Sequence, residues 1–301
     1  MEPLKVSRQN FPKSEATAEG MIVLRPACDN YELKYHPGVQ YADRNGHELC
    51  LEIIEPVDVG RKTPLVVFIP GSAFRRQNVK ERVAQLALLA TRGYAVALLE
   101  YRGSDDAAFP ALVLDAKAGV AFMKKSGDYN IDRDNVFLMG DSSGGYKSLM
   151  AGLTVGVESL EDELVRATDY CVRGIIDFYG PTDITTMNDE PSGQDHRGPD
   201  SPEGRLIGGY NVIEHPELSR PTIVKNYLHD GGKYPPVIMF HGSNDEAVPF
   251  SQSCELYTAL KKVGGQAELY QIEGAHHGDR QFWSSSVLDT IQAFIEKNRK
   301  Q

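Results

Sequence analysis

The sequence lacks most features that mark a secreted, membrane-bound or metal-binding protein. Only four of its 301 residues are cysteine (Cys28, Cys50, Cys171 and Cys254), and their wide spacing suits neither a disulfide framework nor a zinc site. No Asn-x-Ser/Thr sequence occurs, and no apolar run approaches the ~18 residues of a membrane span. The first residues show no apolar signal region. We therefore expect a cytoplasmic protein with free thiols, no membrane partner, no metal and no other cofactor.

Positive charge is also scarce. The 32 Lys and Arg residues are outnumbered by 42 Asp and Glu, the formal net charge is −10, and no basic cluster offsets it. Nucleic acid and anionic membrane surfaces repel such a chain, so neither is expected as a partner. A hydrophobic content of 41% and a charged content of 25% are ordinary for a globular protein. Composition leaves the oligomeric state undecided, a homo-oligomer included.

What the chain does contain is a regular alternation of short apolar and amphipathic segments. Residues 1–20 are polar and mixed, and we interpret them as a poorly ordered lead-in. Residues 31–56 alternate as in a β-hairpin, with a turn at 43–46. The continuous apolar run at 65–69 predicts a strand buried on both faces. Further strands are expected at 94–99, 136–139, 172–179, 237–241 and 267–272. Amphipathic helices are expected between them, at 79–91, from 110, and at 143–155, 251–263 and 283–297.

This alternation predicts an α/β fold with a mostly parallel central sheet, helices on both faces and an antiparallel hairpin near the N-terminus. A stretch rich in Pro, Gly and Asp interrupts it at about 181–234. So long an interruption inside a compact domain is typical of a lid or a binding insertion. We therefore expect one domain over 21–301 that carries a lid-like insertion.

The strand expected at 136–139 runs into Gly140-Asp141-Ser142-Ser143-Gly144. Gly-x-Ser-x-Gly between a strand and a helix is the nucleophile-elbow pattern, in which a serine sits on a strained turn. The glycines lack Cβ atoms, so the two arms of the turn can approach closely. The pattern predicts Ser142 as a nucleophile. We interpret Asp141 as a carboxylate at the N-terminus of the following helix that stabilises the turn.

Two later strand ends supply the residues that would activate this serine. Asp245 follows the strand at 237–241, and His277 follows the strand at 267–272. The histidine can remove the serine proton, and the aspartate can fix the histidine tautomer. The order Ser142, Asp245, His277 is that of the α/β-hydrolase triad, so these three are the predicted catalytic residues. Asp230 and Asp279 fit the acid position less well.

A fourth strand end could complete the site. The loop after 65–69 reads Pro70-Gly71-Ser72-Ala73-Phe74. Small residues here allow backbone N–H groups to turn inwards and donate to a developing oxyanion. A plain tight turn explains the loop equally well when it is considered alone.

Taken together, these segments resemble the α/β-hydrolases of the esterase/lipase class, close to the acetyl-esterase and feruloyl-esterase-like group. The resemblance covers residues from about 31 to 298. Besides the elbow and the loop at 67–74, it rests on Glu100-Tyr101-Arg102, Phe109-Pro110-Ala111, Ser201-Pro202-Glu203, His241-Gly242-Ser243-Asn244-Asp245 and Gly274-Ala275-His276-His277-Gly278.

The resemblance has consequences for individual residues. The family pattern Gly-Ala-x-His-Gly places the catalytic histidine at His277 rather than at His276. An oxyanion hole is implied, formed by the backbone N–H groups of Ser72, Ala73 and Ser143. Many relatives have His-Gly-Gly where this chain has Pro-Gly-Ser, and the proline has no N–H to donate. A hole of slightly different shape, or a shifted acyl preference, is the expected result.

The function that the resemblance implies is a serine carboxylesterase acting through an acyl-enzyme on a small-molecule ester. The polar insertion favours short acyl groups, such as acetyl or a small aromatic acyl on a carbohydrate. Two alternatives share the fold. One is a peptidase of the prolyl-oligopeptidase type, although this chain has no room for its usual propeller. The other is a non-catalytic ligand-binding protein, which would need no complete triad.

Overall fold

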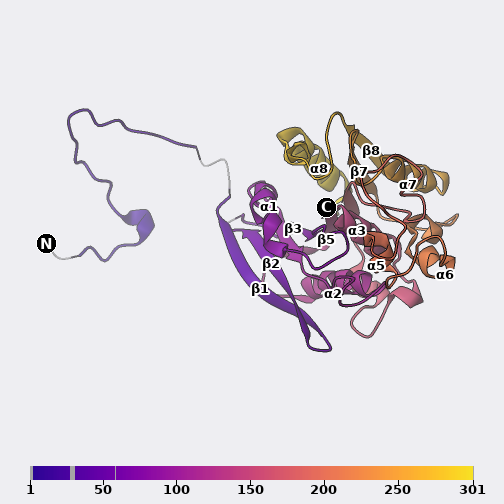
Figure 1. The fold of residues 1–301 in the computed structure, drawn as a ribbon. Coiled ribbons are helices and arrows are strands. Elements are labelled where there is room, and N and C mark those ends of the chain that lie inside the picture. Colours follow the sequence, from indigo (N-terminus) through magenta and orange to yellow (C-terminus); the bar gives the residue numbers. More distant parts are fainter. Residues whose placement is uncertain (1–2, 28–30, 58, 301) are drawn as a thin grey trace.

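The computed structural model describes residues 3–27, 31–57 and 59–300. Cys28 lies outside the described residues, so the expectation of a free thiol there is not addressed; Cys50 and Cys254 are free. Residues 3–27 form a single 3-10 turn (Arg8–Asn10), expose their side chains and extend away from the body of the molecule (Figure 1). Residues 21–27 thus share the character of the lead-in, and the first strand begins at Leu33.

Within the described residues, eight strands form one sheet in the order β1-β2-β4-β3-β5-β6-β7-β8. β1 and β2 form the expected antiparallel hairpin, and β2 also pairs antiparallel with β4. All later neighbours are parallel. The bounds are β1 Leu33–Arg44, β2 His47–Pro56, β3 Thr63–Ile69, β4 Ala95–Leu99, β5 Ile131–Asp141, β6 Gly174–Phe178, β7 Val237–Gly242 and β8 Ala267–Ile272.

Helices cover both faces of this sheet, which explains why the central strands are apolar throughout (Figure 1). Leu65, Val67 and Ile69 of β3 pack with the helices α2, α3 and α7. Val66 and Phe68 point the other way, to α1 and α8. The bounds are α1 Val83–Ala90, α2 Ala111–Lys125, α3 Ser143–Leu153, α7 Ser251–Lys262 and α8 Ser285–Asn298. The predicted α/β fold is confirmed.

Two predicted helices start later than expected. The segment predicted at 79–91 opens with the 3-10 turn η2 (Val79–Arg82), where the Asn78 side chain accepts the N–H of Lys80, and α1 follows. The segment predicted at 283–297 is preceded by the 3-10 turn η6 (Arg280–Trp283). Ser284 is extended, so Trp283 belongs to that turn and not to α8.

The stretch at 181–234 contains short helices, namely α5 (Pro202–Leu206), α6 (Pro216–Ser219), η4 (Arg220–Thr222) and η5 (Val224–Tyr227). Its apolar side chains Ile184, Leu206, Val212 and Val224 are buried in the same cluster as α2 and α3. The insertion is therefore part of the core of this domain. α4 (Ala167–Tyr170) precedes β6. No helix in the described part of the chain is both long enough and apolar enough to cross a bilayer.

Candidate active site

The elbow lies where β5 ends and α3 begins. Ser142 has φ 52° and ψ −128°, a conformation that costs a non-glycine residue energy and that persists only where the surroundings enforce it. At Ser142, the surrounding atoms that pack most closely around the turn belong to the backbone. A Cβ on Gly140 would lie 2.3 Å from the carbonyl oxygen of Gly144, and one on Gly144 would lie 1.9 Å from that of Ile69. The two glycines therefore allow the close approach that the turn requires.

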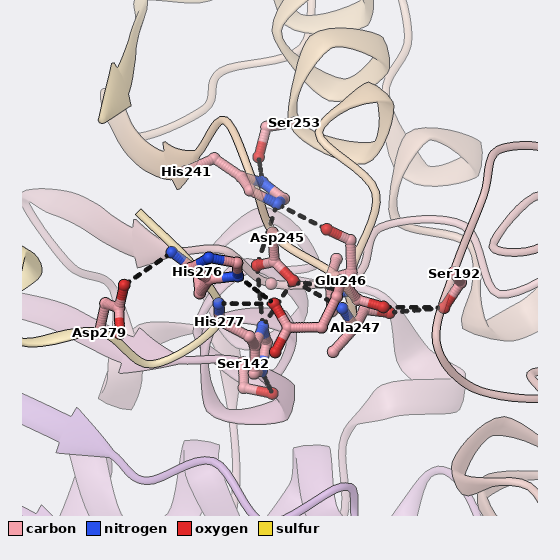
Figure 2. A network of polar contacts seen from close by, with 12 residues as sticks. Ser142, Ser192, His241, Asp245, Glu246, Ala247, Ser253, His276, His277 and Asp279 are labelled. Carbon is pink, nitrogen blue, oxygen red and sulfur yellow. Dashed lines mark hydrogen bonds and ion pairs between the residues drawn. The ribbon is translucent and has the colours of Figure 1, made fainter. Parts of the chain in front are cut away.

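Ser142, His277 and Asp245 form a continuous chain of hydrogen bonds (Figure 2). His277 Nε2 lies 2.9 Å from Ser142 Oγ, and His277 Nδ1 lies 2.8 Å from Asp245 Oδ2. Because the carboxylate accepts the proton on Nδ1, Nε2 is left to accept the serine proton. Ser142 follows β5, Asp245 follows β7 and His277 follows β8, so three strand ends bring the residues together.

Asp245 is fully buried and surrounded by donors. Its Oδ1 accepts the backbone N–H groups of Ala247 at 2.9 Å and Val248 at 2.8 Å, and His241 Nε2 lies 3.4 Å from Oδ2. Burial alone would raise the pKa of Asp245. Hydrogen bonds from His241 and His277, and the electrostatic interaction with the His277 ring, outweigh it and hold the pKa well below its usual range. Asp245 thus stays ionised opposite His277.

The alternative candidates for the catalytic histidine and acid do not contact Ser142. His276 is 57% exposed, and its Nδ1 lies 3.0 Å from Glu246 Oε2 at the surface. Asp279 Oδ2 accepts the backbone N–H of His276 at 2.8 Å (Figure 2). Asp230 is an exposed residue of the insertion. The structure therefore brings His277 and Asp245 to Ser142, and none of the three alternatives.

Asp141 joins the elbow to the loop that follows β3. Its Oδ1 accepts the N–H of Gly71 at 2.6 Å, and its Oδ2 lies 3.2 Å from Arg82 Nε. This agrees with the interpretation of Asp141 as a residue that stabilises the turn. Its carboxylate fixes the position of the loop relative to Ser142.

The geometry separates the three predicted oxyanion donors. The Ser72 N–H donates to Ser143 Oγ at 3.0 Å, so it points to a side chain and not to the reaction site. Ala73 and Ser143 line the cavity beside Ser142, and within the described residues neither N–H has a protein acceptor. Ala73 (φ 52°) and Phe74 (φ 64°) both occupy the left-handed region. The prediction of Ser72 as a donor is therefore not supported by this geometry, because Ser143 Oγ takes its N–H.

Ser142 and His277 open into a cavity of about 280 Å³. One wall is the loop from Gly71 to Phe74, and another is Tyr179 with Val248. The insertion closes the remaining side with Pro181, Gln194, His196, Pro202 and Glu203.

Residues 51–260 match the BD-FAE family model. The chain belongs to the BD-FAE family. This agrees with the resemblance to α/β-hydrolase esterases that the motifs indicated.

Three relatives of this BD-FAE chain illustrate the similarity. Esterase LipC of Mycobacterium tuberculosis is 27% identical over 221 residues, 72% of this chain and 53% of LipC. A probable isoprenylcysteine alpha-carbonyl methylesterase of Oryza sativa is 27% identical, over 80% of this chain and 57% of its own length. A truncated form of carbohydrate esterase from gut microbiota superposes with a TM-score of 0.78 at 27% identity, over 91% of this chain and 98% of that one. This chain spans about half the length of the curated relatives that it matches.

Two residues that line the cavity of this BD-FAE chain received no role from the sequence. His196 and Glu203 are buried against each other, with His196 Nδ1 2.9 Å from Glu203 Oε2, and both line the cavity. His196 Nε2 lies 2.9 Å from Ser192 Oγ, which also contacts the carbonyl of Glu246 next to Asp245. Glu203 belongs to the Ser201-Pro202-Glu203 stretch of the resemblance, but only tertiary packing shows that it pairs with His196. Within the described residues, no cluster of His, Cys, Asp and Glu could hold a metal ion.

Proposed function

We propose that this BD-FAE domain is a serine carboxylesterase that hydrolyses short-chain acyl esters through an acyl-enzyme. The observation that carries the proposal is the chain of hydrogen bonds from Asp245 through His277 to Ser142, beside a cavity. An ionised Asp245 accepts the Nδ1 proton of His277, and this arrangement leaves Nε2 to accept the proton of Ser142.

The reaction follows from this geometry. His277 Nε2 takes the proton of Ser142 as Oγ attacks the ester carbonyl. The N–H groups of Ala73 and Ser143 donate to the oxyanion of the tetrahedral intermediate. His277 then protonates the departing alcohol. Water, activated by the same histidine, releases the acid and restores Ser142.

Cavity size supports a small acyl group. A volume of about 280 Å³ is at the lower end of the range for small-molecule sites, roughly 300–1,000 Å³. Its insertion side is polar, with Gln194, His196 and Glu203. Such a wall suits hydroxyl groups better than a long alkyl chain. The similarity to a carbohydrate esterase agrees with acetyl or small aromatic acyl esters of sugars as substrates.

Replacing the nucleophile tests the reaction. Ser142→Ala is expected to lower kcat for p-nitrophenyl acetate by about 10⁶ and to abolish labelling by a fluorophosphonate, with an unchanged melting temperature. A variant that keeps its activity would refute the assignment of Ser142. Wild-type protein that neither reacts with the probe nor cleaves any ester would instead indicate a binding protein.

A series of p-nitrophenyl esters tests the substrate class. Acetate and butyrate are expected to exceed octanoate about tenfold or more in kcat/KM, because the cavity is small and polar side chains of the insertion would face the longer chain. Acetylated and feruloylated sugars, together with a prolyl peptide, complete the panel. A preference for octanoate would overturn the cavity argument, and cleavage of the peptide alone would favour a peptidase.

A further inference from the structure

Lys147 is a fully buried lysine directly beneath the elbow. It lies in α3, and no part of it is exposed. Its Nζ lies 2.9 Å from the carbonyl oxygen of Ser143 and 3.2 Å from Ser143 Oγ. Two aromatic rings face the same nitrogen, with the ring centres of Tyr101 at 3.9 Å and Phe74 at 5.5 Å. Burying an amine is costly, so its partners must compensate for the lost hydration.

The three residues that contact Lys147 Nζ either form the walls of the proposed oxyanion hole or support those walls. Ser143 Oγ also accepts the Ser72 N–H at 3.0 Å. Tyr101 is buried, and its hydroxyl donates to the carbonyl oxygen of Pro70 at 2.8 Å. Phe74 is the second of the two left-handed residues in the loop. Lys147 therefore contacts both the elbow and the loop that follows β3, but it does not line the cavity.

We propose that Lys147 is the positioning residue of the oxyanion hole, which it sets through the side chain of Ser143. This rests on the proposed function. The Lys147 Nζ fixes Ser143 Oγ, and Ser143 Oγ fixes the loop by accepting the Ser72 N–H. The N–H groups of Ala73 and Ser143 are thereby held at a constant separation.

This arrangement accounts for two other observations. First, it gives a role to the Ser72 N–H, which does not face the oxyanion. This group connects the loop to the elbow by donating to Ser143 Oγ. Second, the left-handed conformations of Ala73 and Phe74 persist only if neighbouring atoms enforce them, and Lys147 lies under the Phe74 ring. Burial lowers the pKa of Lys147 well below its usual value, and Asp141 acts in the opposite direction. The ammonium and the neutral amine both donate N–H, so the positioning role holds in either form.

Lys117 provides a matched control. It is a second fully buried lysine, on α2, and its Nζ donates to the carbonyl oxygens of Thr154 at 2.9 Å and Leu160 at 2.8 Å. A ring also faces it, that of Tyr170 with its centre at 4.8 Å. None of these residues lines the cavity. Loss of Lys117 therefore reports the cost of deleting a buried amine without any effect on the oxyanion hole.

The experiment compares Lys147→Met with Lys117→Met on p-nitrophenyl acetate and on its thionoester, whose sulfur accepts hydrogen bonds poorly. Both variants are expected to melt at lower temperature than wild type. Lys147→Met should also lower kcat by about 10- to 100-fold at a KM within threefold, and it should shrink the rate ratio of ester to thionoester. Lys117→Met should leave kcat and this ratio unchanged.

A double-mutant cycle with Ser143→Ala completes the test. Ser143→Ala keeps the backbone donor but removes Oγ, so it should reproduce the loss of kcat and add nothing in the Lys147→Met background. Should Lys147→Met fail to fold, Ser143→Ala alone carries the test on kcat and on the rate ratio. If the wild type is active and the variants keep its rate ratio of ester to thionoester, the positioning role of Lys147 is overturned, and the proposed function is not. A wild type that cleaves neither substrate would overturn the proposed function, and the role of Lys147 with it.

Discussion

Replacing Asp245 by Asn changes one atom of the site and leaves its shape intact. Oδ1 accepts the N–H groups of Ala247 and Val248, so an asparagine with its carbonyl oxygen in that place keeps both hydrogen bonds. Its NH₂ group then replaces Oδ2, the atom that accepts the Nδ1 proton of His277 at 2.8 Å. Two donors cannot face each other, and the remaining acceptor, Oδ1, lies farther from Nδ1 at 3.1 Å and is shared with two backbone N–H groups, so we expect the proton of His277 to move from Nδ1 to Nε2.

The consequence falls on Ser142. With a proton on Nε2, His277 points a donor at Ser142 Oγ across 2.9 Å, and it can no longer accept the serine proton. A wrong tautomer of this kind costs ~10⁴ in kcat, which corresponds to about 5 kcal/mol of barrier. KM should change little, because Asp245 does not line the cavity.

The assay is p-nitrophenyl acetate hydrolysis, with melting curves to verify that the variant is folded. Asp279→Asn and His276→Gln serve as controls, since both residues lie beside the triad at the surface and neither contacts Ser142. Each control should keep kcat within threefold. If Asp245→Asn retained kcat within tenfold of wild type, the tautomer argument would be refuted. A large loss of kcat in Asp279→Asn would show that Asp279, and not Asp245, is the acid of the triad.

Two further predictions concern stability. Asp177 is fully buried, and among the described residues the Gly180 N–H is the only donor to its carboxylate; burial raises the pKa of Asp177 to about 8. The folded protein therefore binds this proton more tightly than the unfolded chain, and stability should fall as pH rises from 4 to 8, by up to about 1.4 kcal/mol per pH unit. Asp177→Asn should remove this component, seen by urea unfolding at pH 5 and pH 8; equal pH dependence in both proteins would contradict it. Gly144→Ala places a Cβ 1.9 Å from the Ile69 carbonyl oxygen, so we expect a loss of about 3 kcal/mol or more, or insoluble protein. A normal melting temperature would show that the elbow can relax.

The strands and the order of the triad could be predicted because they depend on local patterns. β3, β4, β6 and β7 are buried on both faces and appear as apolar runs. Ser142 and Asp245 follow strands with such runs, and His277 follows the half-exposed strand β8, so their convergence comes from the parallel sheet.

Other features could not be predicted because they depend on side-chain packing between distant segments. Ser72 is lost as an oxyanion donor only because Ser143 Oγ lies within reach of its N–H. His196 and Glu203 become a buried pair only when the insertion folds over the cavity. Helices as short as α5 and α6 have too few turns to show a periodic pattern, and packing stabilises them. One signal was available: Lys147 is the only charged residue of α3.

The burial of the insertion in the common core affects the order in which this chain can fold. A single apolar cluster joins Leu51 to Val212 and Leu260, which lie far apart in the sequence. Contacts across such separations form slowly, because long loops must close before burial compensates for the lost chain entropy. During synthesis, part of the apolar surface of α2 and α3 therefore stays uncovered until residues of the insertion have left the ribosome. Exchanging the insertion to alter substrate preference should consequently lower the yield of folded protein before it alters the chemistry.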